Sequence, residues 1–370
     1  MIHIYSNDRF AAFHGSGFGS QMDTIVQSFQ QVEDQFLHPA AARSRHAVRP
    51  HPDDESPVRT PFQVDRDRII HSKAFRRLKH KTQMFLAPDG DHVRTRLTHT
   101  LEVTQIARTI ARALRLNEDL VEAIGMAHDL GHTPFGHAGE RVLNNLLPGF
   151  VHAEQSLRVV DRIEKDGQGL NLTNDVRNGI IHHSKPKGAI TGEISGRPPT
   201  PEAQIMKISD GIAYINHDLD DAIRGDRIRA DQVPSDVLEI LGTRHSERIN
   251  TLVCDIVESS APALDQLDPG DQVIMMSERV QHGANVLRNF LFEYVYDPIN
   301  EEVSTIKAQR IVQVLFEEAI RNPDTIPEEF ARGLANESVE RVAADYVAGM
   351  TDRYALRKFQ ELYIPTFWSG

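Results

Sequence analysis

A histidine–aspartate dipeptide with two distant partners is the clearest chemical feature of this sequence. His128 and Asp129 close a stretch with an apolar helical face, His99 lies on the preceding predicted helix and Asp210 on a later one. Imidazole nitrogens and carboxylate oxygens that converge from separate helices can hold Mn, Fe, Co, Zn or, less well, Mg. A bound divalent ion lowers the pKa of a water ligand and screens the charge of a phosphate. The four residues therefore predict a metal site suited to phosphate hydrolysis.

The dipeptide by itself is weak, because 18 histidines and 53 acidic residues supply such pairs by chance. A second pair, His217–Asp218, is present. Any one of the four residues, taken alone, is more often an ordinary hydrogen-bonded histidine or aspartate. Only the combination favours a metal site.

The loop after Asp129 adds further groups that could do chemistry. Residues 131–137 read Gly-His-Thr-Pro-Phe-Gly-His, and Glu140 follows three residues later. If a helix begins near Gly136, Glu140 shares a face with His137 and can fix its tautomer and raise its basicity. This predicts an acid/base pair of His137 and Glu140. The spacing alone is equally compatible with a solvated helix start, where acidic residues are favourable.

Positive charge gathers upstream of His99. Arg96 lies three residues before it, and residues 76–81 read Arg-Arg-Leu-Lys-His-Lys. Guanidinium groups bind phosphates bidentately, so a polyphosphate substrate is consistent with this charge. A solvated helix face is the commoner explanation for the run 76–81, whereas the position of Arg96 favours a role at the site.

A later predicted helix carries Asp210, Tyr214 and Asp218, which are spaced by four and so share one face. A tyrosine ring on that face can lie against a deoxyribose and make a 2'-hydroxyl sterically unfavourable. The alternative is a polar face turned to water, which Ile212 and Ile215 beside these residues make less attractive.

Composition limits the partners and the compartment. The 370 residues are 40% hydrophobic, enough for a substantial core, and the formal net charge of -12 makes nucleic acid a weak default partner. The single cysteine, Cys254, excludes an internal disulfide and a cysteine-rich zinc site, which fits a reducing, cytoplasmic setting. No signal-like start and no apolar run of about eighteen residues is present, so we expect neither secretion nor a membrane span.

Helical periodicity dominates the chain after residue 60, and no alternation typical of strands is visible. The apolar stripes that indicate helices fall within residues 103–114, 120–127, 142–147, 205–215, 306–320 and 339–350. A helix is also possible over 22–36, and the Gly- and Pro-rich residues 186–201 predict an exposed connection. We therefore expect an all-α fold without internal repeats.

Taken together, these motifs resemble the bacterial deoxyguanosine triphosphate triphosphohydrolases and their deoxynucleotide triphosphohydrolase relatives, which are HD-domain phosphohydrolases. The segments that carry the resemblance are RTPFQ at 59–63, DRDRIIHSKAFRRLKHKTQ at 65–83, RLTHTLEV at 96–103, HDLGHTPFGHAGE at 128–140, HAEQS at 152–156, ISDGIAYINHDLDD at 208–221 and AGMTDRYA at 348–355. The combination is highly specific and spans most of the chain after residue 57.

The resemblance implies an HD-domain helical bundle with additional C-terminal helices. It divides the chain into a poorly structured extension (1–56), a metal-dependent catalytic core (57–230) and a C-terminal helical region that packs on the core (231–370). The reaction implied is hydrolysis of a deoxynucleoside triphosphate, dGTP or several, to deoxynucleoside and inorganic triphosphate. Homo-oligomer formation and weak single-stranded nucleic-acid binding are further expectations.

Roles for individual residues also follow from the resemblance, by position. The metal ligands implied are His99, His128, Asp129 and Asp210, and the catalytic pair is His137 with Glu140. The substrate-binding residues implied, around the phosphates, sugar and base, are Arg96, His132, His152, Tyr214, Asp218 and Gln83.

Two other functions stay open at this point. Another HD hydrolase, acting on a cyclic nucleotide or on guanosine tetraphosphate, would use the same metal ligands. A regulatory oligomer that binds nucleotides or single-stranded nucleic acid would fit the basic run 76–81. The intact pair of His137 and Glu140 counts against a protein that only binds.

Overall fold

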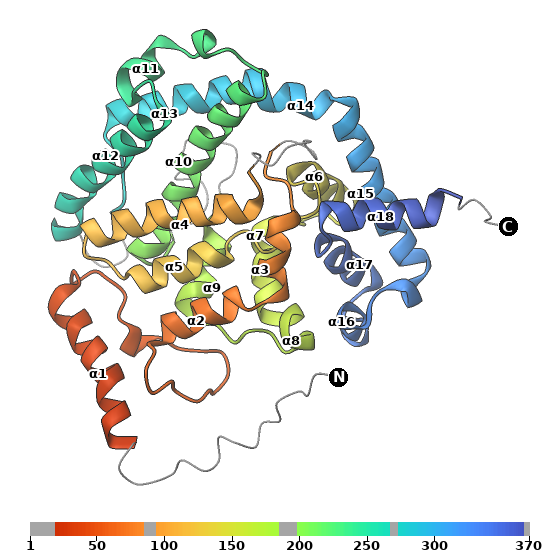
Figure 1. Ribbon diagram of the computed structural model, residues 1–370. Helices are drawn as coiled ribbons and strands as arrows, with labels where there is room; N and C mark the ends of the chain where they lie inside the picture. Colours follow the sequence, from red (N-terminus) through yellow and green to blue (C-terminus); the bar gives the residue numbers. More distant parts are fainter. Residues whose placement is uncertain (1–18, 85–93, 185–197, 267–272, 366–370) are drawn as a thin grey trace, which may run out of the picture.

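The computed structural model of the protein describes residues 19–84, 94–184, 198–266 and 273–365 (Figure 1). Within these ranges the regular structure is helical, apart from one isolated antiparallel bridge between Thr82 and Thr95. The predicted all-α class is confirmed. The longer helices are α1 (Gly19–Phe36), α2 (Pro61–Ile70), α4 (Arg96–Ala113), α5 (Glu118–Ala127), α6 (His137–Leu146), α9 (Asn174–His182), α10 (Pro201–Arg224), α12 (His245–Gln266), α13 (Glu278–Leu291), α15 (Val303–Arg321), α17 (Val339–Ala348) and α18 (Asp352–Tyr363). The shorter ones are α3 (Lys73–Arg77), α7 (His152–Arg158), α8 (Glu164–Gly167), α11 (Ser235–Leu241), α14 (Asp297–Glu301) and α16 (Glu328–Ala331).

Polar caps fix where the site-bearing helices begin. The hydroxyl of Thr95 accepts a hydrogen bond from the backbone of Thr98 at the start of α4, and the side chain of Asn117 does the same for α5. Thr200 caps α10, and Pro201 follows at its first position. These residues satisfy backbone N–H groups that a helix cannot pair internally. The helix starts are therefore encoded locally.

The larger hydrophobic core is built around α4, α5 and α10, which pack on one another near the centre of the molecule (Figure 1). The predicted stripes are buried there, with Val103, Ile106 and Ile110 of α4 and Leu120 and Ile124 of α5 almost wholly covered. Burying such side chains contributes about 1.5–3 kcal/mol each. This core holds the helices that carry the metal-ligand candidates.

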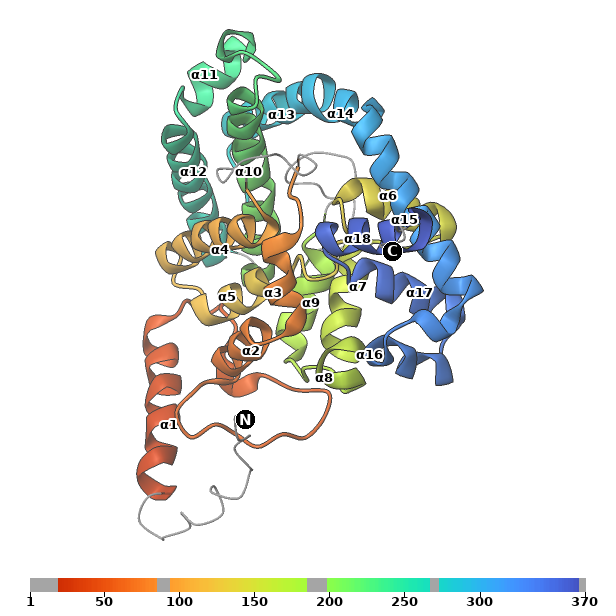
Figure 2. The same ribbon diagram turned by 45° about the vertical axis from the view of Figure 1, so that its right-hand side comes forward.

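A second core joins α6 to the C-terminal helices α15 and α17, which lie together on one side of the molecule (Figure 2). Leu143 of α6 is fully buried among Val312, Phe316 and Val347. Helices α11–α13, by contrast, contribute to the first core. The C-terminal region thus packs directly on the helix that begins at His137, while the predicted boundary near residue 230 stays a prediction.

Two further predictions from the sequence concern segments outside the two cores. The possible helix over residues 22–36 is observed as α1, which lies at one end of the molecule in both views (Figures 1 and 2). The predicted connection over 186–201 falls largely outside the described residues. Among the helices that are described, none is long and apolar enough to span a membrane.

Candidate metal centre and active site

Helix α4 brings Arg96 and His99 to the centre of the molecule. The Thr95 cap starts the helix at Arg96, so the two side chains lie one turn apart on the same face. Both are buried, with about 1% of each residue exposed. The cap therefore sets the register of both residues toward the site.

His128 and Asp129 follow the end of α5, and Asp210 lies in the middle of α10. The Nε2 atom of His99 is 3.2 Å from Asp210 Oδ1, and His128 Nε2 is 3.8 Å from the same oxygen. Asp129 Oδ1 lies 3.5 Å from His128 Nε2. His99, His128 and Asp210, which come from three separate parts of the chain, thus place their ligand atoms within 4.8 Å of one another, and Asp129 lies beside this group at His128.

The hydrogen bonds around His128 show that this cluster fits a metal ion. Its Nδ1 atom donates to the carbonyl oxygen of Gly125 at 2.7 Å, because a carbonyl can only accept. In the neutral ring Nε2 therefore carries a lone pair, and this buried atom has no hydrogen-bond partner among the residues that the structure describes. It faces two carboxylate oxygens, which are also acceptors. A divalent cation satisfies such a set of donors, and two imidazoles with two carboxylates suit Mn, Fe, Co or Zn.

Glu140 organises a second group of histidines on the far side of Asp129. Its two oxygens accept from Nδ1 of His137 and Nδ1 of His152, each at 2.8 Å, and it also accepts from the backbone of His152 at 2.7 Å. Although burial opposes ionisation, these histidines hold the pKa of Glu140 well below its usual range. The His137 side chain is 69% exposed, whereas His152 is largely covered. A permanent carboxylate therefore orients an accessible imidazole.

His132 connects these two groups. Its Nε2 is 3.1 Å from Asp129 Oδ1, its ring stacks on that of His152 at 4.0 Å, and its Nδ1 has no partner among the described residues. The structure thus brings His132, His137 and His152 together within one array beside Asp129.

Arg96 is the cation best placed for an anionic substrate. Its Nη1 donates to Asp129 Oδ2 at 2.9 Å, while Nε and Nη2 are buried without partners among the described residues. A Cβ atom at Gly136 would lie 3.1 Å from Nη2, and the φ of Gly136 is +58°. Glycine at this position therefore leaves room around the Arg96 guanidinium, whose Nε and Nη2 groups can donate hydrogen bonds to a ligand.

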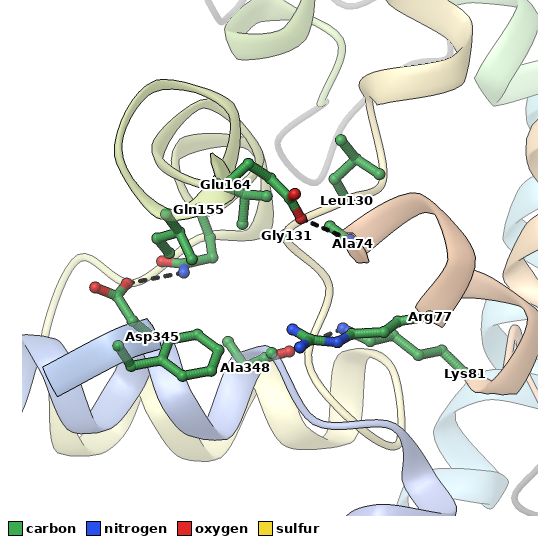
Figure 3. A pocket seen from close by; sticks show the side chains of 13 residues that line it. Ala74, Arg77, Lys81, Leu130, Gly131, Gln155, Glu164, Asp345 and Ala348 are labelled. Carbon is green, nitrogen blue, oxygen red and sulfur yellow. Dashed lines mark hydrogen bonds between the residues drawn. The ribbon is translucent and has the colours of Figure 1, made fainter. Parts of the chain in front are cut away.

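Within the basic run 76–81, Arg76, Lys79 and His80 are exposed, whereas Arg77 and Lys81 are held by contacts within the protein. Lys81 is buried, and its ammonium donates to the carbonyl of His132. It also donates to the carbonyl of Ala348 at 2.8 Å (Figure 3). Burial lowers the pKa of Lys81 to about 7. Arg77 pairs with Glu329 at 3.0 Å. Both cations tie the loop and α3 to the C-terminal helices.

Asp352, the first residue of α18, fastens the same loop. Its Oδ1 accepts from the backbone of Phe135 and its Oδ2 from the backbone of Thr82, each at 2.9 Å. Phe135 has a φ of +63°, a conformation that side-chain-bearing residues adopt at a cost of order 1–3 kcal/mol. The C-terminal region thus holds the strained turn that leads into His137.

Tyr214 and Asp218 lie on α10 beyond the metal cluster, as their spacing predicted. The hydroxyl of Tyr296 donates to Asp218 Oδ2 at 2.6 Å, and the rings of Tyr214 and Tyr296 are 6.4 Å apart. Asp218 Oδ1 is buried without a partner among the described residues, and burial raises the pKa of Asp218 to about 6. Gln83 is half-buried, its backbone lies near Gly136, and its Oε1 has no partner among the described residues. Asp218 and Gln83 thus each keep one acceptor atom unpaired within the described part of the chain.

Several residues at the site were not identified from the sequence: His183, Tyr296, Lys81 and Asp352. Tyr296 and Asp352 lie more than 70 residues from the atoms they contact. His183 follows His182 at the end of α9. The two adjacent histidines are visible in the sequence, but the sequence does not indicate that His183 lies at the site. Only the tertiary structure brings these side chains to the site.

The helical fold and the convergent His and Asp ligands define a phosphohydrolase of the HD class. The HD domain family matches residues 96–215, and the phosphohydrolase-associated domain family matches residues 274–361. The chain belongs to the family of deoxyguanosinetriphosphate triphosphohydrolase-like proteins, as three relatives with that name show.

The relative from Caldanaerobacter subterraneus subsp. tengcongensis is 52% identical over 92% of this chain and 96% of its own length. Those from Desulfatibacillum aliphaticivorans and Clostridium perfringens are 47% and 44% identical, over 93% and 92% of this chain and 99% and 97% of their own lengths. A solved structure of a hypothetical protein from Aquifex aeolicus is 19% identical with a TM-score of 0.41, covering 81% of this chain and 71% of that chain, a likeness that supports no inference.

Proposed function

We propose that this protein hydrolyses deoxynucleoside triphosphates to deoxynucleoside and inorganic triphosphate. The observation that carries the proposal is the position of Asp129, whose Oδ1 lies 3.5 Å from His128 Nε2 and 3.1 Å from His132 Nε2, between two groups of side chains. One holds the ligand candidates His99, His128 and Asp210, and the other holds His137 on Glu140, with Asp129 between them. The names of the relatives support the substrate class.

The metal ligands in this proposal are His99, His128, Asp129 and Asp210. When bound there, a divalent ion supplies a water of lowered pKa and positive charge for the phosphate. Arg96, with its two unpartnered nitrogen atoms, binds phosphate oxygens, and His132 offers its free Nδ1 to the same group. These contacts hold the α-phosphorus near the metal cluster.

His137 handles the proton. Because its Nδ1 donates to Glu140, the atom open to substrate is Nε2. Water attacks the α-phosphorus, the bond from phosphorus to the 5'-oxygen breaks, and the 5'-oxygen leaves with a proton. Glu140 also holds His152 in place, and His152 contributes to binding the phosphates.

Tyr214, Asp218 and Gln83 form the sugar and base side of the site. The ring of Tyr214 packs against the deoxyribose and excludes a 2'-hydroxyl, and the unpartnered Asp218 Oδ1 accepts from a sugar hydroxyl. Gln83 contributes a further polar contact. A cytoplasmic location, homo-oligomer formation and weak single-stranded nucleic-acid binding belong to the same proposal.

Product analysis tests the reaction. Purified protein with Mn2+ or Mg2+ should release inorganic triphosphate from at least one of the four deoxynucleotides, supplied singly and as a mixture. Release of pyrophosphate in its place contradicts the proposal. A faster rate in the mixture than in the single reactions would indicate activation of one nucleotide's hydrolysis by another.

The role of Tyr214 has a separate test. Each ribonucleoside triphosphate should be hydrolysed much more slowly than its deoxy counterpart, and Tyr214→Ala should narrow that ratio. Equal rates on the two sugars with the wild-type protein would refute the role of Tyr214 while leaving the reaction itself intact.

A further inference from the structure

A second set of possible metal donors includes Asp129 but none of the residues His99, His128 and Asp210. Asp129, His152 and His183 each offer one ligand atom, and these atoms lie within 4.8 Å of one another. The group is separate from the one formed by His99, His128 and Asp210, and none of the roles above uses His183. The rings of His128 and His183 are 5.1 Å apart, so the two groups are immediate neighbours.

His183 is fixed so that one nitrogen points into this group. It caps the C-terminal end of α9 and is 1% exposed. Its Nδ1 donates to the carbonyl of Ile180 at 2.6 Å, because that oxygen can only accept. In the neutral ring, Nε2 of His183 is therefore a lone-pair donor to a metal and not an N–H group.

The same reasoning applies to His152 from the other side. Its Nδ1 donates to the carboxylate of Glu140, which in the neutral ring leaves a lone pair on its Nε2. The two Nε2 atoms of His152 and His183 are 3.2 Å apart. Two lone pairs that face each other in a buried space repel, unless a proton or a metal cation lies with them.

We propose that Asp129, His152 and His183 bind a second divalent cation, with Asp129 shared between the two metal sites. Two neutral imidazoles and a carboxylate suit Mn, Fe, Co or Zn, and three protein ligands leave positions for water or phosphate oxygen, so that His152 would act on the phosphates through this ion. Second-shell partners already orient both imidazoles, Glu140 for His152 and the Ile180 carbonyl for His183. The inference deepens the proposed function, on which its catalytic meaning rests, because paired cations are a common arrangement for phosphoryl chemistry.

Metal content tests the second site independently of turnover. The full-length protein is stripped of metal, reloaded with saturating Mn2+, and its Mn content per chain is measured by mass spectrometry. Electron paramagnetic resonance on the same samples distinguishes an exchange-coupled pair of Mn2+ ions from isolated ions. The wild type should hold two ions per chain with the coupled signal.

The decisive variant is His183→Asn, which keeps a side chain able to donate toward Ile180 but lacks the imidazole. It should hold one ion per chain and show the signal of isolated Mn2+. The matched control is His182→Ala, which removes the adjacent, partly exposed histidine of the same helix end. This control should retain two coupled ions, and circular dichroism should show the same helicity in all three proteins.

Two results would overturn the proposal. Wild-type protein that holds a single ion at saturating Mn2+ means that a proton, not a metal, joins His152 and His183. Two coupled ions in His183→Asn mean that the second ion lies elsewhere. These outcomes are distinct from failure of the proposed function. Two bound ions without triphosphate release would refute the proposed reaction and support the second metal site. One bound ion with triphosphate release would support the reaction and refute the second site.

Discussion

The metal-ligand cluster and the histidine array beside it are held in different ways. His99, His128 and Asp210 lie on or directly after the long helices α4, α5 and α10, which share one hydrophobic core. His137 follows a strained turn whose backbone is fastened by Asp352, from a part of the chain more than 200 residues away. The first group is positioned by helix register and core packing, the second by long-range hydrogen bonds. Damage to each should therefore have different consequences.

Loss of a metal ligand should have the largest effect. His99→Ala removes one donor of the cluster, so we expect the chain to lose bound metal and deoxynucleotide hydrolysis to fall by about 10³-fold or more. Metal analysis and turnover are measured on the same sample. His46→Ala, which changes a histidine of the N-terminal segment outside the site, is the control and should retain both. Full metal content in His99→Ala would show that His99 is not a ligand.

Loss of the proton-transferring group should have a comparable effect on turnover and none on metal. His137→Ala should lower hydrolysis by about 10²–10⁴-fold, because the general acid/base is gone while the helices of the metal cluster are untouched. Glu140→Gln should fall between His137→Ala and the wild type, since an amide holds His137 less firmly. If His137→Ala loses its metal as well, His137 is a ligand and not the proton carrier.

The fastening of the turn predicts an intermediate effect. Asp352→Asn replaces one of two carboxylate acceptors with an amide donor, so the backbone of Phe135 or Thr82 loses its partner. We expect kcat to fall by roughly tenfold to hundredfold through misplacement of His137, with metal content unchanged. Asp324→Asn, an exposed carboxylate in the same C-terminal region, should behave as wild type. A wild-type kcat in Asp352→Asn would mean that the turn at Phe135 keeps its conformation without the hydrogen bonds from Asp352.

The metal-ligand cluster could be predicted from the sequence to a greater extent than the contacts that hold the histidine array. Periodic apolar stripes and polar caps are local signals, so the helices carrying His99, His128 and Asp210 could be predicted, and with them the all-α class. The convergence of those residues was predicted as a set, and the structure brings them together. The spacing of three between His137 and Glu140 likewise predicted the hydrogen bond observed between them.

Contacts between distant segments had no such local signal. Lys81 was part of a basic run that suggested phosphate binding or a solvated face, yet its ammonium is buried against two carbonyls. Tyr296 reaches Asp218 from the short π-helix Phe292–Tyr296 that follows α13, and nothing in its neighbours along the chain indicates this contact. Such contacts depend on how the two cores dock, which periodicity does not encode.

The smallest expected effect is a change in the stability of the fold caused by substitution of a buried residue far from the site. Glu202 at the start of α10 is fully buried, accepts from the backbones of Ala42 and Asn117, and has an Oε2 without a partner among the described residues. Burial raises the pKa of Glu202 from 4.5 to about 7. Because the folded pKa is above the unfolded one, its contribution to stability is present below pH 4.5 and is lost as pH rises through 7.

Glu202→Gln should remove that pH dependence. Relative to the wild type, the variant should gain up to about 3 kcal/mol in free energy of unfolding between pH 4.5 and pH 8, as measured by urea unfolding at each pH. A constant difference between the two proteins across this range would show that Glu202 titrates normally. Hydrolysis per folded molecule should not change, which separates this core position from both parts of the site.

Isotope labelling of the products tests the central claim most directly. In ¹⁸O-enriched water with Mn2+, attack at the α-phosphorus and cleavage of its bond to the 5'-oxygen should place one ¹⁸O atom in inorganic triphosphate and none in the deoxynucleoside. Label in the 5'-hydroxyl of the deoxynucleoside would mean attack at carbon. Labelled deoxynucleoside monophosphate or labelled pyrophosphate would mean cleavage between the α- and β-phosphates and would contradict the account.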